Sequence, residues 1–196
     1  MSLTGYCVDA PTVDVDDPAL VPLIAACRER GSTALVGAAV RHGPRPAIGI
    51  LAVGSEGTQI VYRKMNLGTS ETGVYEPGES VAVVEVSAWR IGLGICKDTR
   101  IDQHIEATMA EGIDLYAAGL VHAPNEIGEF DVRARRIAAT GGVPVVFAGF
   151  AGPTGGGFDK TSGGSAIWDA AGRRLTQASD RAGEHVVADV EITSGT

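Results

Sequence analysis

Cys96 is the side chain of this sequence best suited to act as a nucleophile. It follows the apolar segment 91–95 (IGLGI) and precedes a helical pattern. We therefore expect its thiol at the carboxyl edge of a sheet, where α/β proteins commonly build their sites. The N-terminus of the following helix would stabilise negative charge and so favour the thiolate. A lone cysteine in an apolar strand is more often a buried core residue, and that ordinary interpretation is kept for Cys7 and Cys27.

Lys64 is the second side chain with chemical potential. It follows a strand pattern and begins a long irregular segment. An ammonium on a flexible stem can stabilise an oxyanion or a neighbouring thiolate. Glu71 lies in the same irregular segment, and Lys97 directly follows Cys96. By residue type alone, Lys64 would be a solvated surface charge and Glu71 an exposed loop acid.

Several motifs follow one another in a fixed order along the chain. They are residues 62–67 (YRKMNL) with Glu71 and 75–78 (YEPG), then 92–100 (GLGICKDTR), 133–140 (RARRIAAT) and 163–172 (GGSAIWDAAG). In this order they resemble the carbon–nitrogen hydrolase (nitrilase-like) family, and the resemblance extends from about residue 3 to residue 191. The order and context of these motifs outweigh the ordinary interpretations of Lys64 and Cys96.

The resemblance implies an α/β fold, an α-β-β-α sandwich in which two sheets pack face to face between helices. It also implies a triad of Glu, Lys and Cys, in which Lys64 and Cys96 match and the Glu is the general base. That Glu stands in the family shortly before Leu-Thr-Gly-Tyr, which is residues 3–6 here, so it would fall immediately before Met1. We therefore expect a single domain over residues 1–196, N-terminally shortened and missing its first strand–helix–strand. Either the chain is truncated or mis-assigned at its start, which the intact remainder of the site favours, or it is a degenerate member.

Other positions acquire expected roles from the same resemblance. Glu71 matches a second acidic position that orients groups in the pocket, and the backbone N–H of Lys97 is expected to help hold the oxyanion. Two positions depart from the family. Lys97 replaces an aromatic or other residue, which marks either a substrate anion or a subfamily, and Gly149 stands where many relatives have Asn, so a polar contact is lost.

The implied reaction is hydrolysis of a non-peptide carbon–nitrogen bond in a small amide, carbamoyl compound or nitrile through a thioester on Cys96. Without the triad Glu, the chain is expected to be weakly active or inactive. The alternative is a non-catalytic scaffold or binding protein with the same fold. Acyl transfer to an acceptor other than water would use the same residues, and the identity of the substrate stays open.

The helices that must position these residues are indicated by periodicity and by caps. One is expected from Asp17 to Gly31, with Asp17 as its N-cap, Gly31 as its left-handed end and Pro22 delaying its start. A second follows Cys96 and ends near residue 112. A third covers residues 126–140 and is expected to turn its arginines, at positions 133, 135 and 136, mostly outward.

Short β-branched and apolar runs between Gly and Pro residues predict the strands. They fall in two groups, sequentially paired in the first half of the chain and alternating with helices in the second half, which indicates a mixed sheet. The expected strands are 33–40, 47–53, 58–62, 81–86, 90–95, 115–121, 143–150, 165–168 and 185–190, with irregular segments at 65–80 and 151–164.

Composition and charge limit the partners. The 196 residues carry a formal net charge of −8, which argues against nucleic acid and anionic membranes. The three cysteines form no C-x-x-C pair and the four histidines no metal-ligand spacing, so neither a metal nor another cofactor is expected. No apolar run approaches the ~20 residues that span a bilayer, and no signal-peptide pattern opens the chain, so a cytoplasmic protein is expected. The resemblance further implies a homodimer, and the Gly-rich segment 151–164 lacks the Gly-Lys pair of a phosphate loop.

Overall fold

The computed structural model describes residues 2–7 and 9–191, and the chain divides into two compact units, Met1–Ser80 and Val81–Thr196. The prediction of one domain over residues 1–196 stays a prediction. Both units combine a β-sheet with helices, so the predicted α/β class is confirmed within each of them.

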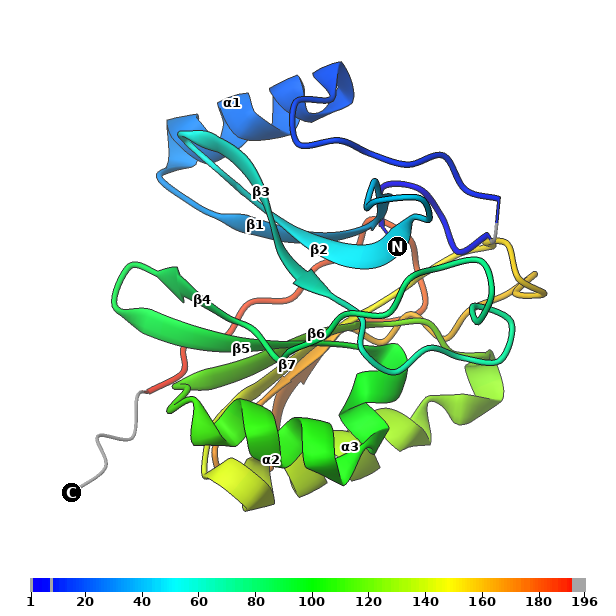
Figure 1. Ribbon diagram of the computed structural model, residues 1–196. Coiled ribbons are helices and arrows are strands. Elements are labelled where there is room, and N and C mark those ends of the chain that lie inside the picture. The colour runs from blue at the N-terminus through cyan, green and yellow to red at the C-terminus, as the bar shows by residue number, and fades with distance from the viewer. Residues whose placement is uncertain (1, 8, 192–196) are drawn as a thin grey trace. The chain divides into compact units, whose positions relative to one another are not determined.

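The first unit is a three-stranded antiparallel sheet with a helix on one face (Figure 1). Its elements are η1 (Pro18–Leu20), α1 (Val21–Arg30), β1 (Ala34–Val40), β2 (Ala47–Gly54) and β3 (Gly57–Arg63), and the strand order is β1-β2-β3. Leu20 and Cys27 from the helical segment pack with small and branched residues of β1 and β2 to form the core of this unit. Cys27 therefore has the core position expected for it.

Both ends of the first helical segment are formed as predicted. The Asp17 carboxylate accepts a hydrogen bond from the backbone N–H of Ala19 at 2.8 Å, and Gly31 ends α1 with φ 60°. Pro22 occupies the first turn of α1, because a single turn of 3-10 helix precedes it and delays the α-helical start.

The second unit is a six-stranded mixed sheet. Its strands are β4 (Val83–Val86), β5 (Trp89–Ile95), β6 (Leu115–Leu120), β7 (Val145–Gly149), β8 (Ala166–Trp168) and β9 (Arg174–Gln177), in the order β4-β5-β6-β7-β8-β9. The central strands β5, β6 and β7 are parallel to one another, and the outer pairs are antiparallel.

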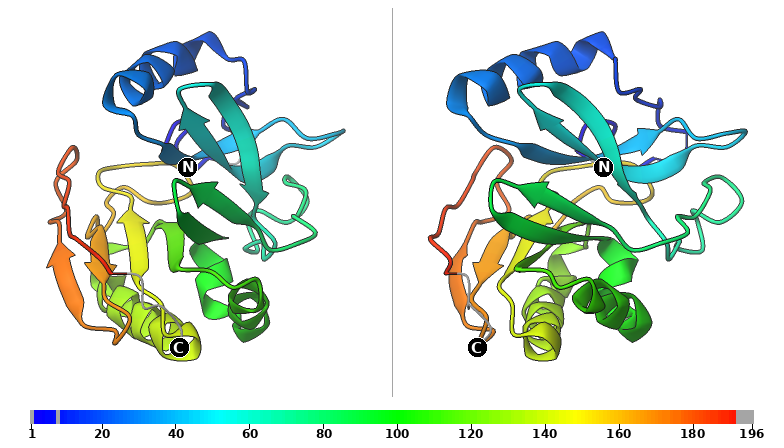
Figure 2. Two further views of the ribbon diagram at one scale, coloured as in Figure 1. Left: turned by 90° about the vertical axis from the view of Figure 1, so that its left-hand side faces the viewer. Right: turned by 60° about the vertical axis from the view of Figure 1, so that its left-hand side comes forward.

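The helices of the second unit lie together on one face of this sheet (Figures 1 and 2). They are η2 (Cys96–Arg100), α2 (Asp102–Ala110), η3 (Pro124–Glu126) and α3 (Gly128–Gly141). Gly142 ends α3 in the left-handed conformation, as predicted. Phe130 and Ile137 of α3 pack against Phe147 and Trp168 of the sheet, and this contact is the centre of the larger core.

Two predicted elements differ from the structure. The last strand is β9 (Arg174–Gln177), whereas residues 185–190, predicted as a strand, form none. Asp169 explains β9, because its carboxylate accepts hydrogen bonds from the N–H groups of Ala171 and Arg173 and so closes a tight turn after β8. The helix predicted to follow Cys96 is the short 3-10 segment η2, and α2 begins only at Asp102.

Candidate functional site

Lys64 and Glu71 form a buried ion pair in the first unit. The Lys64 Nζ lies 2.7 Å from each carboxylate oxygen of Glu71. The exposed fractions of the two residues are 3% and 1%, so neither is the solvated charge that its residue type alone would suggest. A buried ammonium held by both oxygens of one carboxylate has a fixed position, which a surface lysine lacks.

The irregular segment after β3 is folded around the Glu71 carboxylate. The backbone N–H of Gly68 donates to Glu71 Oε2 at 2.5 Å, and the N–H of Glu71 returns a bond to the Gly68 carbonyl at 3.1 Å. Lys64 is fixed at the start of this segment by its own backbone, because its N–H donates to Ile48 and its carbonyl accepts from Gly78, both at 2.8 Å. The segment thus has no regular strand or helix, but its ends and its centre are tied.

The ionisation of Glu71 follows from these contacts. Burial alone would raise the pKa of its carboxyl group, but the charge of Lys64 and the hydrogen bonds from Lys64, Gly68 and Tyr6 together lower that pKa below the ordinary 4.5. Glu71 is therefore a carboxylate at neutral pH. In this state it accepts protons poorly and serves to hold and orient the Lys64 ammonium.

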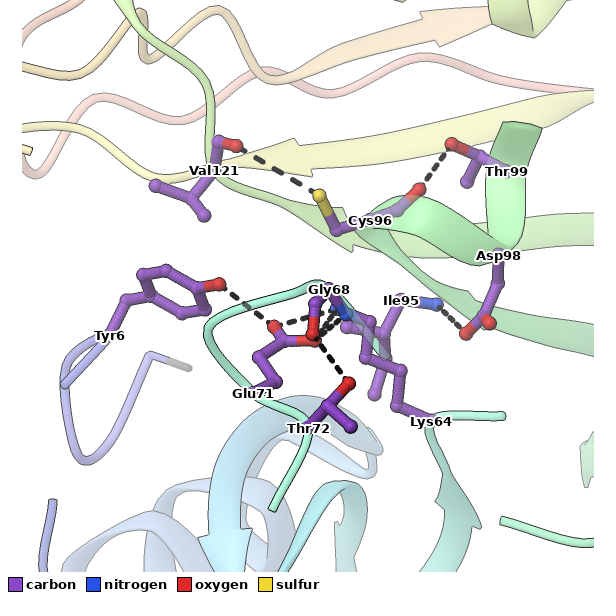
Figure 3. Close-up of polar contacts among 10 residues, drawn as sticks. All are labelled: Tyr6, Lys64, Gly68, Glu71, Thr72, Ile95, Cys96, Asp98, Thr99 and Val121. Carbon is purple, nitrogen blue, oxygen red and sulfur yellow. Dashed lines mark hydrogen bonds and ion pairs between the residues drawn. The ribbon is translucent and has the colours of Figure 1, made fainter. Parts of the chain in front are cut away.

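Tyr6 is a member of this group that the sequence did not single out. Its hydroxyl donates to Glu71 Oε1 at 2.9 Å (Figure 3). The Tyr75 hydroxyl donates to the carbonyl of Cys7 at 2.9 Å and so ties the neighbouring residue to the same segment. The signal was the Leu-Thr-Gly-Tyr motif, which had been used only to locate the triad Glu.

Cys96 directly follows β5 in the second unit and has a strained backbone. Its φ is 45°, and among the described residues other than glycine only Ser87 shares a positive φ. The half-buried Sγ lies 4.0 Å from the carbonyl oxygen of Val121, at the end of β6 (Figure 3). The left-handed conformation costs a β-carbon-bearing residue roughly 1–2 kcal/mol, so neighbouring contacts must hold it.

Those contacts come from the residues immediately after Cys96. The Asp98 carboxylate accepts from the N–H of Ile95 at 2.9 Å, and the Thr99 hydroxyl donates to the carbonyl of Cys96 at 2.6 Å. Asp98 and Thr99 are fully buried. The turn is therefore fixed on both sides of the cysteine, and the exposed Lys97 lies within it.

The predicted support of the thiolate by a following helix has a different basis in the structure. η2 is only five residues long and 3-10 helical, so its aligned dipole is short. The regular helix α2 starts further along, at Asp102. Any stabilisation of a negative sulfur must come mainly from other groups in this unit.

Arg133 corrects a second expectation, because it is buried and not outward. Only 5% of it is exposed, and its Nη1 donates to the Thr99 hydroxyl oxygen at 3.4 Å. Arg135 is exposed and Arg136 partly so, as expected for a mostly outward cluster. The helical spacing contained the signal, because position 133 shares the face of the inward residues Phe130 and Ile137.

Gly149 also has a structural explanation. A Cβ placed on it would lie 1.9 Å from the carbonyl oxygen of Gly163, so no side chain fits there without movement of backbone. The residue therefore allows the Gly-rich segment to approach the end of β7. The asparagine expected at this position in relatives could not be accommodated in this arrangement.

The structure groups the predicted site residues in two sets. The first unit brings together Lys64, Glu71 and the unpredicted Tyr6, and the second brings Cys96 and Lys97 into one turn. Among residues 2–7 and 9–191, no group of three or more His, Cys, Asp or Glu side chains is arranged to hold a metal ion. Within the same residues, no helix has both the length and the apolar character needed to cross a bilayer.

Comparison with known proteins places the chain among enzymes of one family. The sequence profile of the carbon-nitrogen hydrolases matches residues 1–195. An (R)-stereoselective amidase from Pseudomonas sp. is 29% identical over 191 residues, which are 94% of this chain and 69% of that protein.

Solved structures agree with this placement. A CN-hydrolase superfamily protein from Xanthomonas campestris is similar with a TM-score of 0.75 at 18% identity, over 87% of this chain and 67% of that one. The amidase from Nesterenkonia sp. AN1, in complex with butyramide, gives a TM-score of 0.71 at 23% identity, over 89% and 69%. The chain spans about two thirds of the length of these relatives. The expected nitrilase-like fold class is thereby confirmed, and the chain belongs to the carbon-nitrogen hydrolase family.

Proposed function

We propose that this protein hydrolyses a non-peptide carbon–nitrogen bond of a small amide through a thioester on Cys96. The observation that carries the proposal is the positive φ of Cys96 at the end of β5. Strained backbone of this kind persists where the surrounding structure enforces it, and it is concentrated at active sites. A sharp turn between a strand and a helical segment lifts a nucleophile out of the sheet edge, where a substrate can reach it.

The proposed chemistry has two steps. The Cys96 thiolate attacks the amide carbon, and the C–N bond then breaks, so that ammonia or an amine leaves with a proton from a general acid. Water next attacks the thioester carbon, the C–S bond breaks, and the carboxylic acid departs while the thiol is restored. Each step passes through a tetrahedral oxyanion, for which we propose the Lys64 ammonium and the backbone N–H of Lys97 as donors.

Lys64 suits this role because its charge is already oriented. Glu71 neutralises and fixes the ammonium, so the donor does not have to reorganise when the oxyanion forms. Glu71 itself is proposed as an orienting carboxylate and not as the general base, since its pKa lies below 4.5. The amidase of Nesterenkonia sp. AN1 forms a covalent adduct with the acetamide moiety of fluoroacetamide at its active-site cysteine, which supports a cysteine nucleophile in this chain.

The finer properties of the protein are also proposals. We propose that the substrate is a small amide, carbamoyl compound or nitrile, and that the protein is a cytoplasmic homodimer. We further propose that the polypeptide of residues 1–196 turns over weakly, because the family's general base has no counterpart between Met1 and Leu3. General-base assistance is typically worth ~10²–10⁴-fold in rate.

A covalent trapping experiment tests this function. The 196-residue chain would be incubated with a panel of small amides, including butyramide, and followed by ammonia release and intact mass. We expect slow acylation, a mass increase located on Cys96 and little turnover. A second chain, in which a Glu-bearing strand–helix–strand precedes Met1, is expected to release ammonia ~10²–10⁴-fold faster.

Two variants serve as controls. Cys96→Ser is expected to abolish both the adduct and turnover, whereas Cys7→Ser removes the other thiol with partial exposure and should leave both unchanged. If neither chain forms an adduct on Cys96 with any amide, a binding or scaffold role replaces the hydrolase. Equal turnover in the two chains would refute the assignment of the base to an upstream Glu.

A further inference from the structure

Helix α3 grips the turn that carries Cys96 through Thr99. Arg133 donates from Nη1 to the Thr99 hydroxyl oxygen at 3.4 Å, and Arg136 donates from Nη2 to the Thr99 carbonyl at 2.8 Å. Thr99 in turn donates its hydroxyl proton to the Cys96 carbonyl at 2.6 Å. A continuous chain of hydrogen bonds therefore joins a guanidinium group of α3 to the backbone of Cys96.

The hydroxyl of Thr99 is satisfied on both sides in this arrangement. It donates to Cys96 and accepts from Arg133, so each bond directs the other. Accepting from a cation polarises the hydroxyl and strengthens its donation to the carbonyl. That carbonyl belongs to the residue whose φ is 45°, so the contact opposes relaxation of the strained turn.

Arg133 carries a charge that its surroundings do not fully compensate. It is 95% removed from solvent relative to its exposed fraction of 5%, yet its ion-pair partner Glu129 lies 3.7 Å away and is half exposed. The Nε of Arg133 has no hydrogen-bond partner among the described residues. A buried cation in this state is stabilised by any negative charge that forms near it.

The charged groups around Arg133 identify where that negative charge can form. Burial lowers the pKa of Arg133, a Cys96 thiolate would raise it, Arg100 lowers it, and the carboxylates of Glu129 and Glu126 raise it. His122 packs edge-to-face on Phe130, and burial followed by the charge of Arg133 lowers its pKa, so it adds no positive charge at neutral pH. The sulfur of Cys96 is the one reactive group among these neighbours.

We infer that Arg133 is a positioning residue for Cys96, which fixes the turn through Thr99 and favours the thiolate by its buried charge. This inference rests on the proposed function, because it assigns the role relative to a Cys96 nucleophile. Arg133 acts without touching the substrate. The same charge also favours a compact anionic intermediate at the sulfur over the neutral thiol.

The test measures the reactivity of Cys96 without requiring turnover. The rate of its alkylation by iodoacetamide would be followed by peptide mass mapping as a function of pH, in the wild-type chain, Arg133→Gln and Arg135→Gln. Arg135 is the matched control, because it is exposed on the same helix. We expect Arg133→Gln to slow alkylation near neutral pH by about tenfold and to move the profile to higher pH, and Arg135→Gln to leave it unchanged.

Further variants separate charge from geometry and from simple unfolding. Arg133→Lys keeps the charge and is expected to recover most of the pH profile. Thr99→Val removes the hydroxyl and Thr99→Ser retains it, so only the valine variant should slow Cys96. Alkylation in denaturant provides the reference for every variant, since a folded-state effect disappears there.

The outcomes distinguish this inference from the proposed function. If Arg133→Gln leaves the folded-state alkylation profile of Cys96 unchanged while Cys96→Ser abolishes acylation by amides, the inference is wrong and the function stands. If alkylation shifts as expected but Cys96→Ser leaves amide turnover intact, Arg133 tunes the thiol and the proposed nucleophile is wrong. A profile lowered equally by Arg133→Gln and Arg135→Gln would also overturn the inference, because it would reflect overall charge.

Discussion

Replacing Glu71 by Gln tests the buried ion pair most directly. The carboxylate of Glu71 accepts both contacts of the Lys64 ammonium, a bond from Gly68 and a bond from Tyr6. Glutamine keeps the shape but loses the charge, and its NH₂ group would face a donor in place of one acceptor oxygen. Lys64 would remain buried with no carboxylate at hydrogen-bond distance among its described contacts.

The expected magnitude follows from leaving one charge of a buried pair. Such single replacements typically lower the free energy of unfolding by about 3–5 kcal/mol, because the remaining charge has lost both solvent and partner. For a chain of this size each kcal/mol corresponds to roughly 2–4 °C in melting temperature. The matched control is Asp14→Asn in the same unit, whose ion pair with Arg41 is exposed and should be worth at most ~1 kcal/mol.

The pH dependence provides a second readout with a defined sign. Because the pKa of Glu71 in the folded state lies below 4.5, its contribution to stability is fully present above pH 4.5 and is lost as the pH falls through the folded-state pKa. The difference in unfolding free energy between wild type and Glu71→Gln should therefore shrink on acidification below about 4.5. Urea unfolding at several pH values measures it.

A double replacement determines whether the pair itself is responsible. In Lys64→Met/Glu71→Leu no charge remains buried, and much of the lost stability should return even though no activity is expected. The reasoning is refuted if Glu71→Gln is as stable as Asp14→Asn, or if the difference from wild type is independent of pH in the acid range.

Two further predictions concern close contacts in each unit. Tyr6→Phe should lower the free energy of unfolding by about 1.5 kcal/mol in urea and raise the pKa of Glu71 in an NMR titration, because a bond to a charged acceptor is lost; an unchanged pKa would contradict the contact. Gly94→Ala should cost about 1–3 kcal/mol in thermal unfolding, because its Cβ would lie 2.2 Å from the Tyr116 hydroxyl, whereas the control Gly119→Ala meets nothing within 4 Å and should be close to neutral.

Most strands and helices could be predicted because their ends are marked locally. Asp17 and Gly31 bound the first helical segment, and Gly142 ends α3, since a cap depends on side chains and φ angles within a few residues. The last strand was placed wrongly for a related reason. The alternation at residues 185–190 resembles a strand, but β8 pairs instead with β9, through a turn closed by Asp169.

The candidate site was predicted by order of motifs more than by residue type. Lys64 and Glu71 each resemble surface charges in the sequence, and only their place in the family pattern indicated a shared pocket. Their burial and contact in the structure agree with that pattern, although their catalytic roles stay proposals. The strain of Cys96 could not be predicted, because it depends on side chains of η2 that fix the peptide groups around it.

The contrast between Lys64 and Arg133 shows where sequence reasoning about charge ends. Lys64 meets its partner seven positions along the chain, inside one loop, and a nearby carboxylate in the sequence made that pairing conceivable. Arg133 meets Thr99 across 34 positions, after a helix and a strand have returned the chain to the same face of the sheet. The period of α3 already places position 133 inward, but an arginine there appears unfavourable until an acceptor is known. Burial of a charge is thus decided by a remote partner, and an inward-facing arginine on an otherwise apolar helix face is a reason to search for the group it serves.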